Sequence, residues 1–197
     1  MKQQVQVEGI ETLANGFLTL KRYQLSYPRF DGAQTPQVTR EVLVRGHAVA
    51  ALPYDPITDQ ILLIEQFRIG AYHGQANPWV VEVVAGMMDV QGESAEQALH
   101  RELAEEAGIE QAQLQHIVDY FPSPGGSDEQ IKLYLARCDL SGHETGQAFG
   151  VVSETEDIRI HKLPRNQWRQ WMAQGRLNNA ATLLSLFWLD DQLAGCA

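Results

Sequence analysis

The sequence predicts an α/β protein in which a mixed β-sheet lies between helices, preceded by a segment made only of strands. Three observations lead to this fold class. Short apolar or alternating runs, typical of strands, recur along most of the chain. Helical segments bounded by capping residues interrupt them. The two kinds of element do not alternate strictly, so a purely parallel sheet is not expected.

The N-terminal segment, residues 1–45, is expected to form strands without a helix of its own. Residues 17–27 are a mixed alternating run, residues 28–36 are rich in turn formers, and residues 40–45 form another strand. A small sheet cannot bury its apolar face alone, and free strand edges pair with other chains. The segment is therefore predicted to mediate dimerisation, with the main domain covering residues 46–197.

The main domain begins with two almost continuous apolar runs, residues 48–54 and 60–68, joined by a turn at 55–59. This pattern indicates a hairpin of buried strands. A further strand, residues 79–84, leads into a loop at Gly86. Later strands are expected at 114–121, 131–138 and 158–163.

Capping residues mark the helices. Ser94 is a good N-cap residue, and Gly108 suits the position after a helix end. Pro164 is expected as the first residue of a second helix, because proline fits the first helical position. Residues 179–192 form a third, amphipathic helix.

Length and composition bound the function. The 197 residues, of which 44% are hydrophobic and 20% charged, fit one domain or one domain with a small appendage. With 15 basic and 25 acidic residues the net charge is −10, which argues against nucleic acid or an anionic membrane as a partner. If the protein handles phosphates, metal ions must offset the repulsion.

The cysteines and the N-terminus point to an ordinary cytoplasmic protein. Cys138 and Cys196 lack metal-ligand spacing and are expected to be reduced and structural. The N-terminus has no apolar signal segment, and no run of 18 apolar residues occurs. The cytoplasm is therefore the expected location.

Three carboxylates stand within five residues of the first helix. With Leu99 at 0° on a helical wheel, Glu106 falls near about −20° and Glu102 near about −60°, beside the apolar stripe that should face the core. Charges at the edge of a core are unfavourable unless a cation compensates them. Oxygen ligands of this kind suit Mg²⁺ or Mn²⁺. The alternative is a charged surface helix with Arg/Glu pairs, which leaves the spacing to Gly86 and Glu93 unexplained.

The stretch from Glu93 to Ile109 resembles the Nudix box. It matches that pattern completely, with Glu93, Arg101, Glu102, Leu103, Glu105, Glu106, Gly108 and Ile109 in place. Upstream, six residues separate Gly86 from Glu93 where the box has five, so the loop of residues 87–92 is one residue longer. The resemblance extends over residues 16–190 to the bacterial ADP-ribose pyrophosphatases of this family, through motifs at 40–48, 65–68, 82–87, 123–126, 154–158 and 178–181.

This resemblance implies a Nudix fold, an α/β/α sandwich, and a homodimeric enzyme. It implies an enzyme that splits the pyrophosphate bond of ADP-ribose into AMP and ribose 5-phosphate with several Mg²⁺ or Mn²⁺ ions. Another nucleoside diphosphate sugar, such as GDP-mannose, is the alternative substrate. A non-catalytic module that only senses ADP-ribose would have lost box glutamates, and this chain keeps them.

The resemblance also implies roles for the acidic residues. Metal is expected on the main-chain carbonyl of Ala85 and on Glu102, Glu106 and Glu156. Glu154 is the expected base, although composition alone would make its loop a solvated acidic segment. Glu105 completes the acidic cluster, and Arg101 is expected to orient the glutamates. Glu93 is expected to brace the helix N-terminus.

The expected substrate contacts come from several segments. Each has a structural alternative: the glycine-rich stretch could be a plain hairpin turn, the arginines could be ordinary strand-surface residues, and Phe17 and Leu18 could belong to the core. In the family the N-terminal strands cross to the partner subunit, where the position of Phe17 and Leu18 stacks on adenine. The residues expected to bind substrate are Phe17, Leu18, Arg40, Glu41, Arg45, Arg68, Met87, Ser123, Pro124, Gly125 and Glu129.

Overall fold

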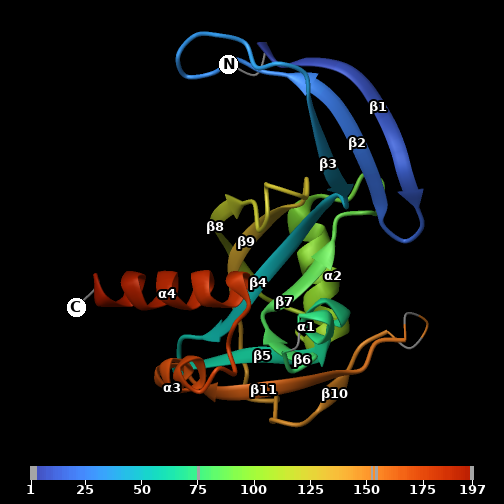
Figure 1. Ribbon diagram of the computed structural model, residues 1–197. Coiled ribbons are helices and arrows are strands. Elements are labelled where there is room, and N and C mark those ends of the chain that lie inside the picture. The colour runs from blue at the N-terminus through green and yellow to red at the C-terminus, as the bar shows by residue number, and fades with distance from the viewer. Residues whose placement is uncertain (1–3, 75, 152, 154, 196–197) are drawn as a thin grey trace. The chain divides into compact units, whose positions relative to one another are not determined.

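The fold is that of a computed structural model, which describes residues 4–74, 76–151, 153 and 155–195 (Figure 1). It divides into two compact units. Unit 1 comprises residues 1–47 and 121–130, and unit 2 comprises residues 48–120 and 131–197. No helix in the described residues is long and apolar enough to cross a membrane.

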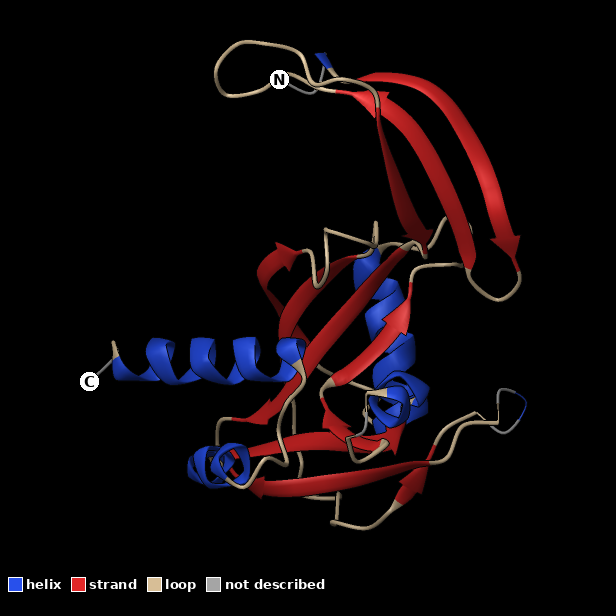
Figure 2. Ribbon diagram, viewed as in Figure 1, coloured by secondary structure: helices blue, strands red, loops and turns tan. Residues whose placement is uncertain are grey.

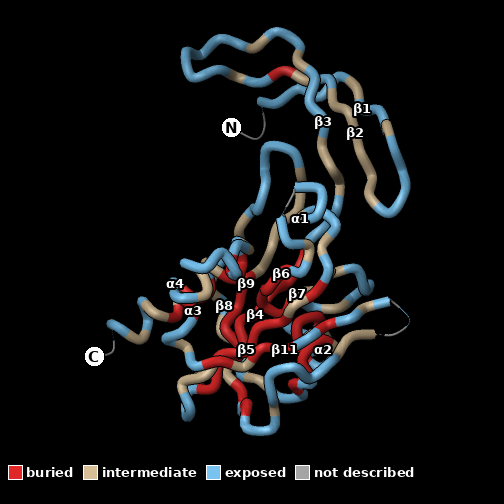
Figure 3. Tube along the Cα trace, turned by 60° about the horizontal axis from the view of Figure 1, so that its bottom comes forward, coloured by how far each residue is buried: buried red, intermediate tan, exposed pale blue. Residues whose placement is uncertain are grey.

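Unit 1 is an antiparallel sheet of strands β1 (Gln6–Asn15), β2 (Thr19–Ser26) and β3 (Val38–Val44), with β2 in the centre. The segment 121–130 joins it through β3, where the Leu43 amide donates to the Gly126 carbonyl (2.8 Å) and the Asp128 amide to the Leu43 carbonyl (3.2 Å). Buried residues are scarce along these strands (Figure 3). Phe17, in the β1–β2 turn, is fully exposed within the single chain, so it does not belong to a core of this unit.

Unit 2 contains the main sheet. In the described residues its strand order is β10-β11-β5-β4-β9-β8, with β6 paired to β5 and β7 paired to β4. The bounds are β4 (His47–Asp55), β5 (Gln60–Phe67), β6 (Trp79–Glu82), β7 (Val84–Met87), β8 (Gln113–Tyr120), β9 (Gln130–Arg137), β10 (Ala148–Phe149) and β11 (Ile158–Pro164). The helical elements are α1 (Ile69–His73), α2 (Ala95–Ala107), the 3-10 turn η3 (Arg165–Gln167), α3 (Trp168–Ala173) and α4 (Ala180–Ala194), drawn in Figure 2.

Helices pack on both faces of this sheet. Leu62 and Ile64 of β5 point into a core shared with α2, whereas Ile61 and Leu63 point into a second core shared with α3 and α4. This alternation is the signature of a strand buried on both faces. The expected α/β fold, with a mixed sheet between helices and additional N-terminal strands, is confirmed.

The ends of helix α2 follow from local sequence. The Ser94 hydroxyl accepts from the Gln97 amide, and the Gln97 side chain accepts in return from the Ser94 amide, which makes a capping box. Gly108 ends the helix in the left-handed region with φ 66°. Both expected capping residues are therefore in place.

The prediction that Pro164 starts a helix is wrong. Pro164 is the last residue of β11, where it pairs with Gln60, and the helical turn begins only at Arg165. The Arg165 amide donates to the Asp59 carbonyl (2.9 Å), which extends the strand pairing past the proline. The expected strand at 79–84 is also interrupted, because the Val83 amide donates to the Thr182 hydroxyl (3.0 Å) and divides β6 from β7.

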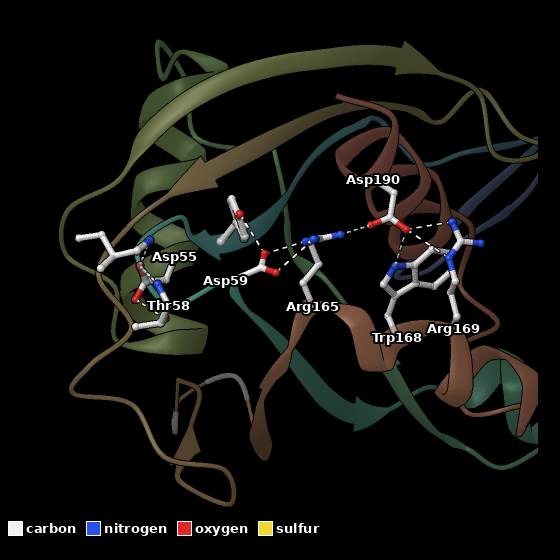
Figure 4. Close-up of polar contacts among 9 residues, drawn as sticks. Asp55, Thr58, Asp59, Arg165, Trp168, Arg169 and Asp190 are labelled. Carbon is white, nitrogen blue, oxygen red and sulfur yellow. Dashed lines mark hydrogen bonds and ion pairs between the residues drawn. The ribbon is translucent and has the colours of Figure 1, made fainter. Parts of the chain in front are cut away.

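A polar network ties the β4–β5 turn to the C-terminal helices (Figure 4). The Arg165 guanidinium donates to both carboxylate oxygens of Asp59 (2.7 and 3.1 Å) and to Asp190 of α4 (2.5 Å). Asp190 also accepts from the Trp168 indole (3.2 Å), and Arg169 stacks over the Trp168 ring. Because Arg165 bridges two carboxylates, it ties the C-terminal half of α4 to the β4–β5 turn.

Candidate active site

The site is built where strand β7 meets helix α2. The amide of Ala85 donates to Oε2 of Glu106 (3.0 Å), so the helix carboxylate is hydrogen-bonded to the strand. A Cβ atom placed on Gly86 would lie 1.9 Å from Cδ of Glu102. The Glu102 carboxyl group therefore occupies the space that any side chain at position 86 would fill. This contact explains physically why a glycine stands here.

Glu106 is the most buried of these carboxylates, with 2% of the residue exposed. Its pKa is raised to about 8, mainly by burial and also by the negative charges of Glu102 and Glu156, while the Ala85 amide and Arg68 oppose the shift. Within the described residues, its other oxygen receives only a long contact, 3.5 Å, from the side-chain amide of Gln66. A carboxylate in this setting is stabilised in its charged form by a cation.

Glu102 is in a similar position. Burial raises its pKa, Arg101 opposes this, and the charges of Glu105 and Glu156 raise it again. Arg101 donates to Glu102 (2.6 Å) and Glu105 (3.2 Å) through one nitrogen and to Glu93 (3.3 Å) through its others. The Arg101 guanidinium thus contacts three of the four box glutamates. The fourth, Glu106, is hydrogen-bonded instead to the main chain of strand β7.

The donor set fits a hard divalent cation. Glu102, Glu106 and Glu156 interact electrostatically with one another, and the main chain of Ala85 adjoins them. Among the described residues, no three His, Cys, Asp or Glu side chains are gathered closely enough to hold a metal by themselves. Water and main-chain oxygen would therefore complete any coordination, as is common for small hard cations.

The acidic loop is described only in part. Glu156 accepts from the Val151 amide (3.2 Å), which folds the loop back onto itself next to Gly150. Glu154, the expected base, lies outside the described residues. Its placement therefore stays a prediction.

Arg68 directly follows strand β5 and is the N-cap residue of α1. Its Nε donates to Oε1 of the buried Glu82 (2.7 Å), and its Nη2 lies 2.6 Å from the same oxygen as an ion pair. Burial raises the pKa of Glu82, and the charge of Arg68 opposes that shift. The effect of Arg68 on the pKa of Glu106 places its positive charge within electrostatic range of the acidic centre.

The remaining expected substrate residues, except Met87, belong to unit 1. There Arg45 pairs with Glu129 (2.9 Å), and its amide donates to Asp128 (2.8 Å), so β3 and the glycine-rich turn are joined. Glu41 pairs with Arg22 (2.8 Å), and the Arg40 guanidinium donates to the Thr39 carbonyl next to it (2.8 Å). The other placements are simple: Ser123, Pro124 and Gly125 form the exposed turn, Leu18 is half-buried, and Met87 ends β7 in unit 2.

Three polar residues around the centre were given no expected role, although the motifs at 65–68, 82–87 and 178–181 contain them. Gln66 and Glu82 lie in strands whose other residues are mostly apolar, and a buried polar residue in such a run is the signal that could have identified them. The third is Asn179, whose side-chain amide donates to Oε2 of Glu82 (3.0 Å). No local pattern links Asn179 to a residue so far away in the sequence.

Comparisons with known proteins agree with this geometry. A model of the NUDIX domain family matches residues 44–177. The chain is 38% identical over 188 residues to the ADP-ribose pyrophosphatase of Escherichia coli (strain K12), covering 95% of this chain and 88% of that protein. It is 41% identical over 191 residues to the enzyme of that name from Haemophilus influenzae, covering 95% and 87%.

The chain therefore belongs to the Nudix family. Within the family, the GDP-mannose pyrophosphatase of Shigella flexneri is more distant, at 29% identity over 190 residues and 96% of each chain. A solved structure titled "Crystal structure of ADP compounds hydrolase" has the same fold, with a TM-score of 0.73 at 21% identity over 99% of this chain and 97% of that one. The fold and the box residues from Glu93 to Ile109 agree on one family, and the identities favour its ADP-ribose pyrophosphatases.

Proposed function

We propose that this protein hydrolyses the pyrophosphate bond of ADP-ribose, releasing AMP and ribose 5-phosphate, in a reaction that depends on Mg²⁺. The main support is the placement of two carboxylates: Glu102 lies against Gly86, and Glu106 is hydrogen-bonded to Ala85. The chain is also 38–41% identical to ADP-ribose pyrophosphatases. Mn²⁺ could take the same oxygen ligands.

The metal would be held by Glu102, Glu106, Glu156 and the Ala85 carbonyl. When bound, divalent ions neutralise the charge that develops on the phosphates as water attacks phosphorus. The raised pKa of Glu106 and of Glu102 supports this assignment, since both carboxylates lack enough cationic partners of their own. Arg101 positions Glu93, Glu102 and Glu105 and does not itself need to touch substrate.

The proton of the attacking water needs an acceptor. We assign this role to Glu154, in the acidic loop that also carries Glu156. Glu105 is partly exposed and shares Arg101 with Glu102, so it completes the acidic cluster beside them.

The diphosphate would be bound by arginines. Arg68 acts electrostatically on Glu106, and its Nη1 has no hydrogen-bond partner within the described part of the chain. Arg40, Arg45 and Glu41 would add further contacts to the diphosphate end of the substrate. Contacts to the ribose or phosphates would come from Ser123, Pro124, Gly125, Glu129 and Met87.

The proposal includes a homodimer. Residues 1–45 would form the dimerisation segment and residues 46–197 the catalytic domain. The exposed Phe17, together with Leu18, would then reach the adenine bound by the partner subunit. The full exposure of Phe17 in the single chain supports this, because an aromatic side chain without contacts is available to a ligand or a second subunit.

A substrate panel tests the proposal. Purified protein is incubated with Mg²⁺ and either ADP-ribose or GDP-mannose, and release of AMP or GMP is scored, with a chelator as the metal-free control. We expect AMP from ADP-ribose in preference to GMP, and no product with the chelator. Preferred release of GMP would favour the alternative substrate suggested by the relative at 29% identity. Binding of ADP-ribose without hydrolysis would identify a non-catalytic module.

A further inference from the structure

Glu82 is a buried carboxylate whose two oxygens are held by different groups. Only 5% of the residue is exposed. Oε1 accepts a hydrogen bond from Nε of Arg68 (2.7 Å) and forms an ion-pair contact with Nη2 of the same guanidinium (2.6 Å). Oε2 accepts a hydrogen bond from the side-chain amide of Asn179, at 3.0 Å. The side chain of Gln66 also hydrogen-bonds to this carboxylate. Buried ion pairs are stable only when their remaining lone pairs are also satisfied, so the Asn179 bond completes the pair.

The bond from Asn179 also fixes the orientation of the arginine. A carboxylate can rotate about its last bond, and with both oxygens free an arginine would bind them side by side. With Asn179 bound to Oε2, the carboxylate keeps the rotation in which Oε1 meets Nε and Nη2 of Arg68, and Nη1 has no partner among the described residues. That free donor is the one available to a ligand.

Asn179 itself is rigidly placed. It is the N-cap of α4, where its oxygen accepts from the Thr182 amide (3.2 Å) and hydroxyl (3.3 Å). The same hydroxyl accepts from the Val83 amide (3.0 Å), directly after Glu82 in the chain. The start of α4 therefore contacts both the carboxylate of Glu82 and the main chain that leads to Ala85.

We propose that Asn179 is a positioning residue for substrate binding, which holds Glu82 so that the Arg68 guanidinium is presented to the diphosphate. This inference rests on the proposed function, in which Arg68 binds that group. The simpler alternative is that Asn179 only caps helix α4, as its oxygen does. The two roles use different atoms of one side chain, so a substitution can separate them.

Asn179→Asp is the separating substitution. Aspartate keeps the oxygen that caps the helix, because Asp and Asn are comparable N-caps. It replaces the amide donor by an oxygen that faces Oε2 of Glu82. Asn178→Asp is the matched control, since it introduces the same charge one residue earlier at an exposed position.

Steady-state hydrolysis of ADP-ribose with Mg²⁺ gives the first readout. For Asn179→Asp we expect KM to rise at least about ten-fold, the change expected on losing a hydrogen bond to a buried charged group, with a smaller change in kcat. Asn178→Asp should match the wild type in both constants. A KM for Asn179→Asp equal to that of the control would overturn the proposal.

A double-mutant cycle with Arg68→Ala gives the second readout. If Asn179 acts through Arg68, Asn179→Asp should raise KM little further once the arginine is absent. Equal effects in the two backgrounds would show that Asn179 acts by another route and would refute the proposal. Asn179→Ser, which keeps a capping hydroxyl and removes the donor, repeats the cycle if the aspartate variant folds poorly.

The proposed function and this inference fail in different ways. Wild-type protein that releases AMP from ADP-ribose and shows an additive cycle contradicts only the inference. Wild-type protein that prefers GDP-mannose contradicts the proposed substrate, and the cycle is then measured with GDP-mannose, which shares the diphosphate.

Discussion

A methyl group added at Gly86 should disable catalysis while leaving the fold intact. In Gly86→Ala the new Cβ would lie 1.9 Å from Cδ and Oε1 of Glu102 and 2.4 Å from Cγ. Carbon atoms in contact normally stand about 3.5–4.0 Å apart, so the carboxyl group must move by roughly 1.5–2 Å. The atoms that clash are at the end of a flexible side chain, so the backbone need not move.

The size of the effect follows from this displacement. A misplacement of about 1 Å at a catalytic group can cost about 10²-fold in rate. We therefore expect kcat of Gly86→Ala to fall by at least about 10²-fold, together with a weaker dependence on the bound metal. An off-rotamer side chain costs only about 0.5–1.5 kcal/mol, so the melting temperature should fall by a few degrees at most.

The assay is AMP release from ADP-ribose over a Mg²⁺ titration, with thermal unfolding measured on the same samples. Gly142→Ala is the control, because no atom lies within 4 Å of a Cβ built there. It should leave kcat and the melting temperature unchanged. A Gly86→Ala protein with wild-type kcat would refute the placement of Glu102 against the β7 main chain.

Three further predictions concern the base, the assembly and pH. Glu154→Gln should retain ADP-ribose and metal binding but slow hydrolysis by about 10²–10⁴-fold, whereas Glu156→Gln should weaken metal affinity; calorimetry showing the reverse would exchange the roles. Light scattering should give a mass of about 44 kDa, twice the 22.1 kDa of one chain. Deletion of residues 1–40 should give monomeric or aggregated protein with poor affinity for ADP-ribose. A fully active monomer would refute an active site shared between two subunits. The hydrogen bonds from Arg165 lower the pKa of Asp59 in the folded protein. They therefore stabilise the fold above the pKa that Asp59 has in the unfolded chain, and this stabilisation is lost as pH falls through the lower folded pKa. In Arg165→Ala the free energy of unfolding, measured with denaturant, should depend less on pH in this range, and an unchanged pH dependence would contradict the prediction.

Features set by neighbouring residues could be predicted from the sequence. Helix α2 begins at the expected N-cap, Ser94, and ends at Gly108, because capping depends on groups within one helical turn. The buried hairpin of β4 and β5 also follows from its apolar runs. Glu102 and Glu106 could be placed at the edge of the core from helical periodicity alone, and both are partly or fully buried.

Features set by distant residues could not be predicted. The break at Val83 is caused by the Thr182 hydroxyl, 99 positions away, and the end of β11 by the pairing of Pro164 with Gln60. Asn179 could be recognised as a cap, but its contact with Glu82 exists only after α4 has packed on the sheet. Packing of this kind depends on the whole fold and leaves no short-range pattern.

The central claim is that buried carboxylates of α2 hold the metal that activates ADP-ribose hydrolysis. The most direct measurement compares AMP release from ADP-ribose by the wild type and by Glu106→Gln across a Mg²⁺ titration. The account predicts metal-dependent release by the wild type and a kcat lower by at least about 10²-fold in a folded Glu106→Gln protein, since the buried negative charge is lost. Near-wild-type activity of the folded variant at ordinary Mg²⁺ concentrations would contradict it.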